Sequence, residues 1–357
     1  MSKKQLILGV VVLVALIALF IYAQHRYPFH WQTFVDQLKL ADWLKIGIGV
    51  GCIYVAYTFR AVRWALLMRH NKRVPLFSLL GTQVIGFTAV ALIGRVADPV
   101  RPYLVSKRTG LPLSTQIAVY IVERLFDAGS MALIFSCVIL LAPAGTLPHP
   151  ELLKKAGYGG LAITLLAGLF LVAVRLAGGV VASFFERAFG LVSKKLGEAV
   201  GHKVRAFRTG LDIMRSFSDF AIASTLSLTM WMLITMAYLE TMRAFTASPP
   251  LAAMALPKCS LMLAVSGTAS VFQLPILGWF SQIGFAAAAM ASFFGATPEA
   301  STACAATLLL VTFLSIVPVG LVWARFEHVS LRKITEESGQ AGEALAVDEP
   351  AVVEKTP

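Results

Sequence analysis

A succession of long apolar runs constrains this chain more than any other feature. The hydrocarbon core of a membrane is about 30 Å thick, so a helix needs about 20 apolar residues to cross it. Runs of this kind lie at 6–23, 43–68, 117–141, 158–174, 220–242, 257–272, 277–294 and 302–323. The chain is 57% hydrophobic and 14% charged, whereas soluble domains carry about 25% charged residues. We therefore predict an all-α, polytopic helical membrane protein, with about eight spans in one domain, 1–330.

The basic residues indicate which side of the membrane is which. In the eight-span layout, most of them gather on one side, in the segments 3–4, 69–73, 101–108, 187–215 and 325–333. Lys and Arg are enriched in cytoplasmic loops, so we expect both termini in the cytoplasm and the protein in a cell membrane, specifically a bacterial inner membrane. The run 6–23 resembles a signal peptide, but the bulky Ile21 makes 21–23 a poor cleavage site. We expect it to remain as the first span.

Composition also excludes some functions. Lys and Arg number 31 against 19 Asp and Glu, but they flank apolar runs, which is typical of membrane topology signals and not of a nucleic-acid binder. The four cysteines stand singly in apolar stretches without ligand spacing, and we interpret them as small buried hydrophobic residues: Cys52, Cys137, Cys259 and Cys304. We expect no metal and no cofactor.

Two segments do not resemble plain spans. The run 78–93 is apolar but short and has basic residues on both sides, which favours a re-entrant or interfacial element. The stretch 273–278, with Pro275 and Gly278, separates two apolar runs without any charge, and Gln282 follows it. A turn inside the membrane survives only where protein or a water-filled cavity satisfies its backbone, and such interrupted helices form binding sites in transporters. A surface turn between two ordinary spans remains an equal alternative.

The segment 184–217 and the C-terminal tail lie outside the spans. Apolar residues recur every three or four positions through 184–217, with most basic residues opposite, which predicts an amphipathic helix on the cytoplasmic leaflet. A purely structural connector would show the same pattern, and the sequence leaves both open. The tail 331–357 is rich in Glu, Ala, Gly and Pro without periodicity, so we predict a disordered cytoplasmic tail.

The run 117–141 contains three ionisable residues, Glu123, Arg124 and Asp127. Each such group costs about 2.5–3.5 kcal/mol at membrane depth, so these groups usually line a cavity or bind something. On a helix Glu123 and Asp127 share a face and Arg124 can reach Asp127. Glu123 then needs a cation from another segment. The candidates are Arg60, Arg63, Arg95 and Arg101.

This cluster has two interpretations. It could serve stability alone, because buried ion pairs are weak evidence of function. It could also bind a ligand, since the planar guanidinium of Arg is suited to bidentate contact with a phosphate diester. A lipid headgroup is the obvious anion at that depth, so Arg60, Arg63, Arg95, Arg101, Glu123, Arg124 and Asp127 are our candidate headgroup-binding residues.

At these residues the sequence resembles the flippase-like family that includes the transmembrane region of lysylphosphatidylglycerol synthases. The resemblance lies in Arg60 with Arg63-Trp64, in the segment from Gly94-Arg95 to Arg101-Pro102-Tyr103-Leu104, and in Glu123-Arg124-Leu125-Phe126-Asp127. The family often has a proline where this chain has Ile93 and an acidic residue where it has Gln282. The second difference argues against proton coupling at that turn. The resemblance implies movement of a phospholipid, or of a lipid-linked headgroup, between leaflets.

Three functions remain open. Lipid translocation through a charged groove, with membrane lipids and above all anionic phospholipid as partners, is the one we favour. A non-transporting partner of a lipid-modifying enzyme is the first alternative, and a lipid-linked transferase is the second. We expect no enzyme, because we find no metal motif, phosphate loop or His cluster, and no extramembrane segment longer than about 40 residues, which is smaller than a typical domain. The sequence leaves the lipid, the energy source and the oligomeric state open.

Overall fold

The computed structural model describes residues 29–94, 97–191, 193–194, 197–201, 204, 216–269, 277–330, 333, 336–337 and 339. All regular elements in these residues are helical. They are α2 (Trp31–Lys39), α3 (Trp43–Met68), α4 (Leu76–Ile93), α5 (Val100–Thr109), α6 (Leu113–Leu140), α7 (Pro150–Gly190), α9 (Phe217–Arg243), α10 (Pro249–Ala252), α11 (Leu256–Ala269), α12 (Leu277–Phe294), α13 (Pro298–Leu309), the π-helical turn η3 (Leu310–Leu314) and α14 (Ile316–Phe326).

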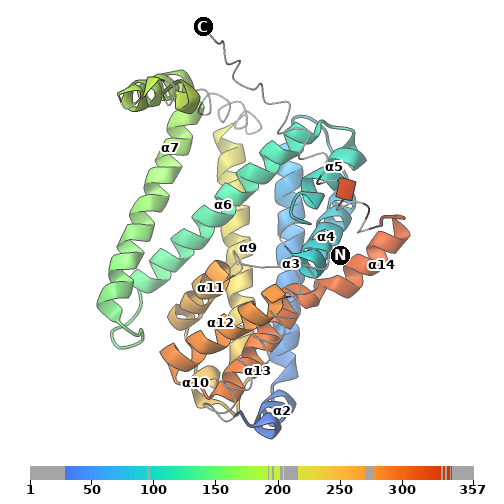
Figure 1. The fold of residues 1–357 in the computed structure, drawn as a ribbon, viewed down its shortest axis with the longest axis vertical. Coiled ribbons are helices and arrows are strands. Elements are labelled where there is room, and N and C mark those ends of the chain that lie inside the picture. Colours follow the sequence, from blue (N-terminus) through green and yellow to red (C-terminus); the bar gives the residue numbers. More distant parts are fainter. Residues whose placement is uncertain are drawn as a thin grey trace, which may run out of the picture.

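The antiparallel pair α3 and α9 runs through the centre of the molecule (Figure 1). Asp42 starts α3 by accepting hydrogen bonds from the backbone N–H of Leu44 and Lys45, and the backbone N–H of Asp42 donates to the carbonyl oxygen of Ala244 beyond the end of α9. At the opposite end, His70 after α3 contacts Asp219 in the first turn of α9, at 3.0 Å. We call the end at the start of α3 the α2 end of the molecule, and the end at the start of α9 the α5 end, after the short helices that lie there.

The helices α4 and α5 form a hairpin. The chain enters the molecule from the α5 end along α4 and returns to the same end along α5. Arg108 near the end of α5 donates a hydrogen bond to the carbonyl oxygen of Ser78 at the start of α4, and Lys72 donates to the carbonyl oxygen of Thr109. Gly94, with φ of 92°, ends α4 in a conformation that L side chains rarely adopt. The predicted re-entrant segment is therefore a returning hairpin, and α4 begins two residues before the predicted position 78.

A second hairpin, α11 with α12, enters from the α2 end. In its described part the single basic residue is Lys258, near the start of α11. The ammonium group of Lys258 lies over the ring of Phe294 at the end of α12, 6.0 Å from the ring centroid. At the start of α12, the indole N–H of Trp279 donates to the carbonyl oxygen of Ala91 near the end of α4, at 2.9 Å. The two hairpins therefore meet inside the molecule. Most of the predicted turn, residues 273–276, lies outside the described residues.

The helices α6 and α7 cover one side of the central pair, and α7 is the outermost (Figure 1). The predicted amphipathic helix, 184–217, begins within α7, which continues to Gly190 after a kink at Ala177. The kink precedes Gly178 and Gly179, and glycine pairs are common sites of helix bending. Residues 205–215, in the second half of the predicted helix, lie outside the described residues.

By length and composition, five described helical segments could cross a membrane: Trp43–Met68, Leu76–Ile93, Pro150–Val174, Phe217–Arg243 and Pro298–Phe326. The polytopic helical class is therefore confirmed. The predicted first span, 6–23, lies outside the described residues. Of the four cysteines, Cys259 and Cys304 are buried and Cys52 is half-buried, but Cys137 is exposed. The prediction of burial fails at Cys137 because the outside of a membrane protein is also apolar.

Candidate functional site

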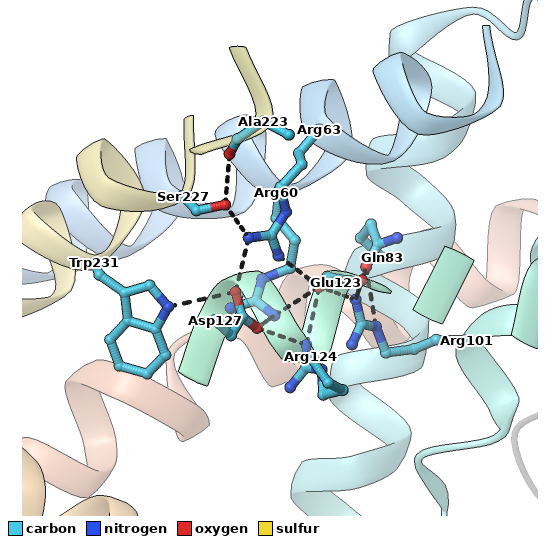
Figure 2. A network of polar contacts seen from close by, with 10 residues as sticks. All are labelled: Arg60, Arg63, Gln83, Arg101, Glu123, Arg124, Asp127, Ala223, Ser227 and Trp231. Atoms are coloured by element: carbon cyan, nitrogen blue, oxygen red, sulfur yellow. Dashed lines mark hydrogen bonds and ion pairs between the residues drawn. The ribbon is translucent and has the colours of Figure 1, made fainter. Parts of the chain in front are cut away.

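Three helices bring six charged residues together in the interior. Arg60 and Arg63 lie one turn apart on α3, Glu123, Arg124 and Asp127 lie on α6, and Arg101 comes from α5 (Figure 2). Residues three or four apart share one helix face, so α3 presents two guanidinium groups to the two carboxylates of α6. We call these six residues the charge network. Except for Arg124, all of them are at most 8% exposed.

Glu123 is the centre of the network. Its Oε1 atom lies 3.0 Å from Nη1 of Arg60, 3.1 Å from Nη2 of Arg63, 2.8 Å from Nη2 of Arg101 and 2.9 Å from Nη2 of Arg124. One carboxylate is therefore in contact with four arginines. The intrahelical compensation predicted for Asp127 is also present, because Nη2 of Arg124 lies 2.9 Å from its Oδ2 atom.

Asp127 joins the network to α9. Its Oδ1 atom lies 2.8 Å from Nη1 of Arg63 and accepts a hydrogen bond of 3.3 Å from the indole N–H of Trp231. Nη1 of Arg63 also donates to the hydroxyl of Ser227, at 2.6 Å, and that hydroxyl donates in turn to the carbonyl oxygen of Ala223. The α9 side chains thus complete the polar shell around the acidic pair (Figure 2).

Arg101 is fixed from α4 and by aromatic rings. Its Nε and Nη2 atoms donate to Oε1 of Gln83, at 3.0 and 2.7 Å. Its guanidinium lies over the ring of Phe87, 4.3 Å from the centroid, and 5.5 Å from the centroid of Tyr120. The side chain passes directly against the backbone at Gly86, where any β-carbon would collide with it. A glycine at this position of α4 therefore lets the hairpin place a charged side chain inside the protein.

The network carries more positive than negative charge. Four arginines face two carboxylates, so two of the positive charges are not matched by a carboxylate within the network. Nη1 of Arg101 is buried and has no hydrogen-bond partner in the described part of the chain, and the same holds for Nε2 of Gln83. A buried donor without a partner costs about 1–3 kcal/mol. Such a site favours the binding of an anion.

A cavity of about 160 Å³ lies next to the network. Arg60 and Trp231 lie between the cavity and the network. Both line the cavity; Arg60 is a member of the network, and Trp231 donates a hydrogen bond to Asp127. Its other walls come from both hairpins, α9 and the π-helical turn, through Phe87, Tyr238, Gln282 and Thr312. The sequence predicts a charged groove lined by these residues. The structure shows instead a network of direct ion pairs, of which one member, Arg60, lines the cavity.

The structure places the remaining predicted residues as follows. Arg95 and Pro275 lie outside the described residues. Gly278 is buried at the start of α12, and Gln282 is in the cavity wall. The sequence interpretation missed Gln83, Ser227 and Trp231. Gln83 is a strongly polar residue in an otherwise apolar run, and this signal could have identified it, whereas Ser and Trp are too common in membrane helices to stand out.

The fold and the site define a helical membrane protein with a buried, cationic charge network and, next to it, a cavity lined by both hairpins. The chain belongs to the Lysylphosphatidylglycerol synthase TM region family, whose profile matches residues 6–320, and this confirms the resemblance seen in the sequence. Membership relates the protein to lipid modification or lipid flipping. No curated protein and no solved structure matches the chain. Within the described residues, no group of three or more His, Cys, Asp or Glu could hold a metal ion.

Proposed function

We propose that this protein moves a phosphate-bearing lipid headgroup between the two leaflets of a cell membrane. The observation that supports the proposal most directly is the buried surplus of positive charge in the charge network. Burying unpaired charge is costly, so a network with two unmatched positive charges is explained better by an anionic ligand than by stability alone. Membership of a family related to lipid modification or flipping agrees with this ligand being a lipid.

Arg124 is the member of the network that a headgroup could reach first. Its side chain is 37% exposed, whereas the other five side chains are at most 9% exposed. A phosphate that contacts Arg124 would replace Glu123 and Asp127 as its partner. Both carboxylates would still be paired, because Arg60 and Arg63 each contact both of them. The exchange therefore leaves no buried acid without a cation.

Reconstitution in liposomes tests the proposal. Fluorescent phospholipids of several headgroups are placed in vesicles, and a membrane-impermeant reductant reports how much label reaches the outer leaflet. We expect bleaching of inner-leaflet label in vesicles that contain the protein and none above background in empty vesicles. Absence of movement for every headgroup, with or without a proton gradient, would refute lipid translocation.

The Arg124→Ala variant connects the assay to the site. We expect transport to fall by at least about tenfold, because charge-assisted contacts to phosphate contribute about 1.5–3 kcal/mol, and Arg124→Lys to restore it in part. Arg187→Ala is the matched control, since Arg187 is an exposed arginine on α7, and we expect wild-type transport from it. Wild-type transport by Arg124→Ala would show that the network is not the transport site.

We also propose that the α5 end faces the cytoplasm. The basic residues of the described chain that lie near this end include Arg69, Lys72, Lys107 and Arg108, and basic loops stay in the cytoplasm. A single cysteine placed at residue 72, in a variant without the four native cysteines, should react with a membrane-impermeant thiol reagent only after cells are opened. Labelling in intact cells would reverse the orientation.

The family description favours a second candidate function. Because the family is described as the transmembrane region of a synthase, this chain could support a lipid-modifying enzyme without transporting lipid itself. Stoichiometric co-purification with such an enzyme, combined with no lipid movement by the isolated protein, would favour this function over translocation.

A further inference from the structure

The cavity beside the charge network has the size of a small headgroup. Its volume is about 160 Å³, and a cavity of about 150 Å³ in a protein core holds a molecule of benzene. It can therefore hold about six non-hydrogen atoms, which is enough for the ethanolamine or glycerol part of a headgroup. Aromatic side chains form much of its wall, among them Tyr57, Phe87, Trp231 and Tyr238.

The cavity has a cationic side and an accepting side. Arg60 lines it and, although paired with Glu123 and Asp127, belongs to the network with surplus positive charge. Gln282 on α12 lines it as well, is only 6% exposed, and its Oε1 atom is buried without a hydrogen-bond partner in the described part of the chain. A buried acceptor without a partner costs about 1–3 kcal/mol. A ligand with an N–H or O–H group would remove this cost.

Several other polar side chains of the cavity wall are already engaged. Tyr238 and Ser266 hydrogen-bond each other, Thr312 donates to the carbonyl oxygen of Leu308, and the indole N–H of Trp231 donates to Asp127. Gln282 is thus the wall residue whose amide oxygen remains available to a ligand. Its position on the second hairpin sets it apart from the charge network, whose members come from α3, α5 and α6.

We propose that this cavity is the headgroup-selecting site and that Gln282 selects phospholipids with a hydrogen-bond donor close to the phosphate. The inference rests on the proposed function, and it adds the class of substrate. The phosphate lies toward Arg60, and the donor, an ethanolamine ammonium or a glycerol hydroxyl, contacts the amide oxygen of Gln282. A choline headgroup has no N–H or O–H group and leaves that oxygen unpaired, although the aromatic wall could hold its methyl groups.

Binding measurements separate this inference from the proposed function. The purified full-length protein in detergent is titrated with short-chain phosphatidylethanolamine, phosphatidylglycerol and phosphatidylcholine by calorimetry. We expect the first two to bind about tenfold more tightly than phosphatidylcholine, which is the effect of one hydrogen bond in a buried site. Equal affinities, or a preference for phosphatidylcholine, would overturn the inference. Binding of none of the three, together with no transport in liposomes, would refute the proposed function itself.

Variants at Gln282 assign the selection to this residue. Gln282→Leu should remove the preference by weakening the binding of the ethanolamine and glycerol lipids about tenfold while phosphatidylcholine is unaffected. Gln116→Leu, which removes a buried glutamine that pairs with Trp64 outside the cavity, should keep the preference even where it lowers thermal stability. If Gln282→Leu does not fold, Gln282→Glu provides the test, because its carboxylate should favour ethanolamine over glycerol. Unchanged ratios in the variant that folds would overturn the assignment.

Discussion

A hydrogen bond joins the described parts of the two hairpins, which differ in what they carry. The α4–α5 hairpin delivers Arg101, which is fully buried and paired with Glu123 and Gln83. The described part of the α11–α12 hairpin carries an uncharged amide, Gln282, which lines a cavity and whose oxygen is buried without a hydrogen-bond partner in the described residues. The α4–α5 hairpin is therefore held by strong electrostatic contacts, in which loss of a partner is costly. The α11–α12 hairpin lines a cavity next to the network. The comparison indicates that charge fixes the first hairpin, whereas the second contributes an uncharged wall to the cavity.

Loss of Glu123 should have the largest effect on this comparison. Glu123→Gln leaves four arginines with one carboxylate, and breaking a buried ion pair costs about 3–5 kcal/mol. We expect the free energy of unfolding to fall by about this amount, or the protein to fail to assemble, as measured by thermal unfolding in detergent. Glu240→Gln, which alters a looser pair of 3.9 Å, should cost less than about 1 kcal/mol. Equal stability of the two variants would contradict an electrostatic anchor.

A methyl group at Gly86 tests the same hairpin through packing. Gly86→Ala places a β-carbon against the Cγ atom of Arg101, and overpacking of this kind costs about 1–3 kcal/mol. Gly284→Ala in α12 is the matched control, because nothing lies within 4 Å of its added β-carbon. We expect that control to be neutral or slightly stabilising, as Ala is the better helix former. Similar thermal stabilities for the two variants would mean that the hairpins do not differ in tightness.

The hydrogen bond between the hairpins should have a moderate effect. Trp279→Phe keeps an aromatic ring but removes the donor to Ala91, so we expect a loss of about 0.5–1.5 kcal/mol. Amide hydrogen exchange should rise at the end of α4 and the start of α12. Trp31→Phe, at an exposed residue of α2, should leave that exchange unchanged. Protection that is the same in both variants would show that the contact does not couple the hairpins.

The smallest effect is expected at the surface of the α5 end. Arg108 forms two hydrogen bonds with Glu327, at 2.8 and 3.0 Å, but both side chains are partly exposed. Exposed ion pairs contribute about 0–1 kcal/mol, so Glu327→Gln, which removes the charge and leaves the bond from Arg108 to Ser78 in place, should lower stability by no more than that. The loss should shrink further in high salt, because screening weakens exposed pairs. A loss as large as that of Glu123→Gln would show that the pair at the surface, and not the buried network, anchors α5.

Part of the site could be predicted from the sequence, because charged residues within an apolar run require partners of opposite charge in any fold. Glu123 and Asp127 lie in an apolar run, so their charges require cations wherever the helix packs, and their spacing shows that they share a face. Arg60, Arg63 and Arg101 were correctly expected to supply those cations. The boundary predicted at residue 184 also depends on a local feature, since a glycine pair can bend a helix without ending it, and the sequence pattern alone does not distinguish these outcomes.

The sequence by itself determined the helical membrane class, the family and the presence of a buried charge cluster, because hydrophobic length and the cost of burying charge depend on residue type alone. Only the tertiary structure decided that Glu123 contacts four arginines, that Gln83 and Trp231 complete the shell, and that Gln282 faces a cavity. These contacts join residues far apart in the chain. They depend on how the helices pack, and helix packing is set by the whole set of side chains at the contacts and by no single run.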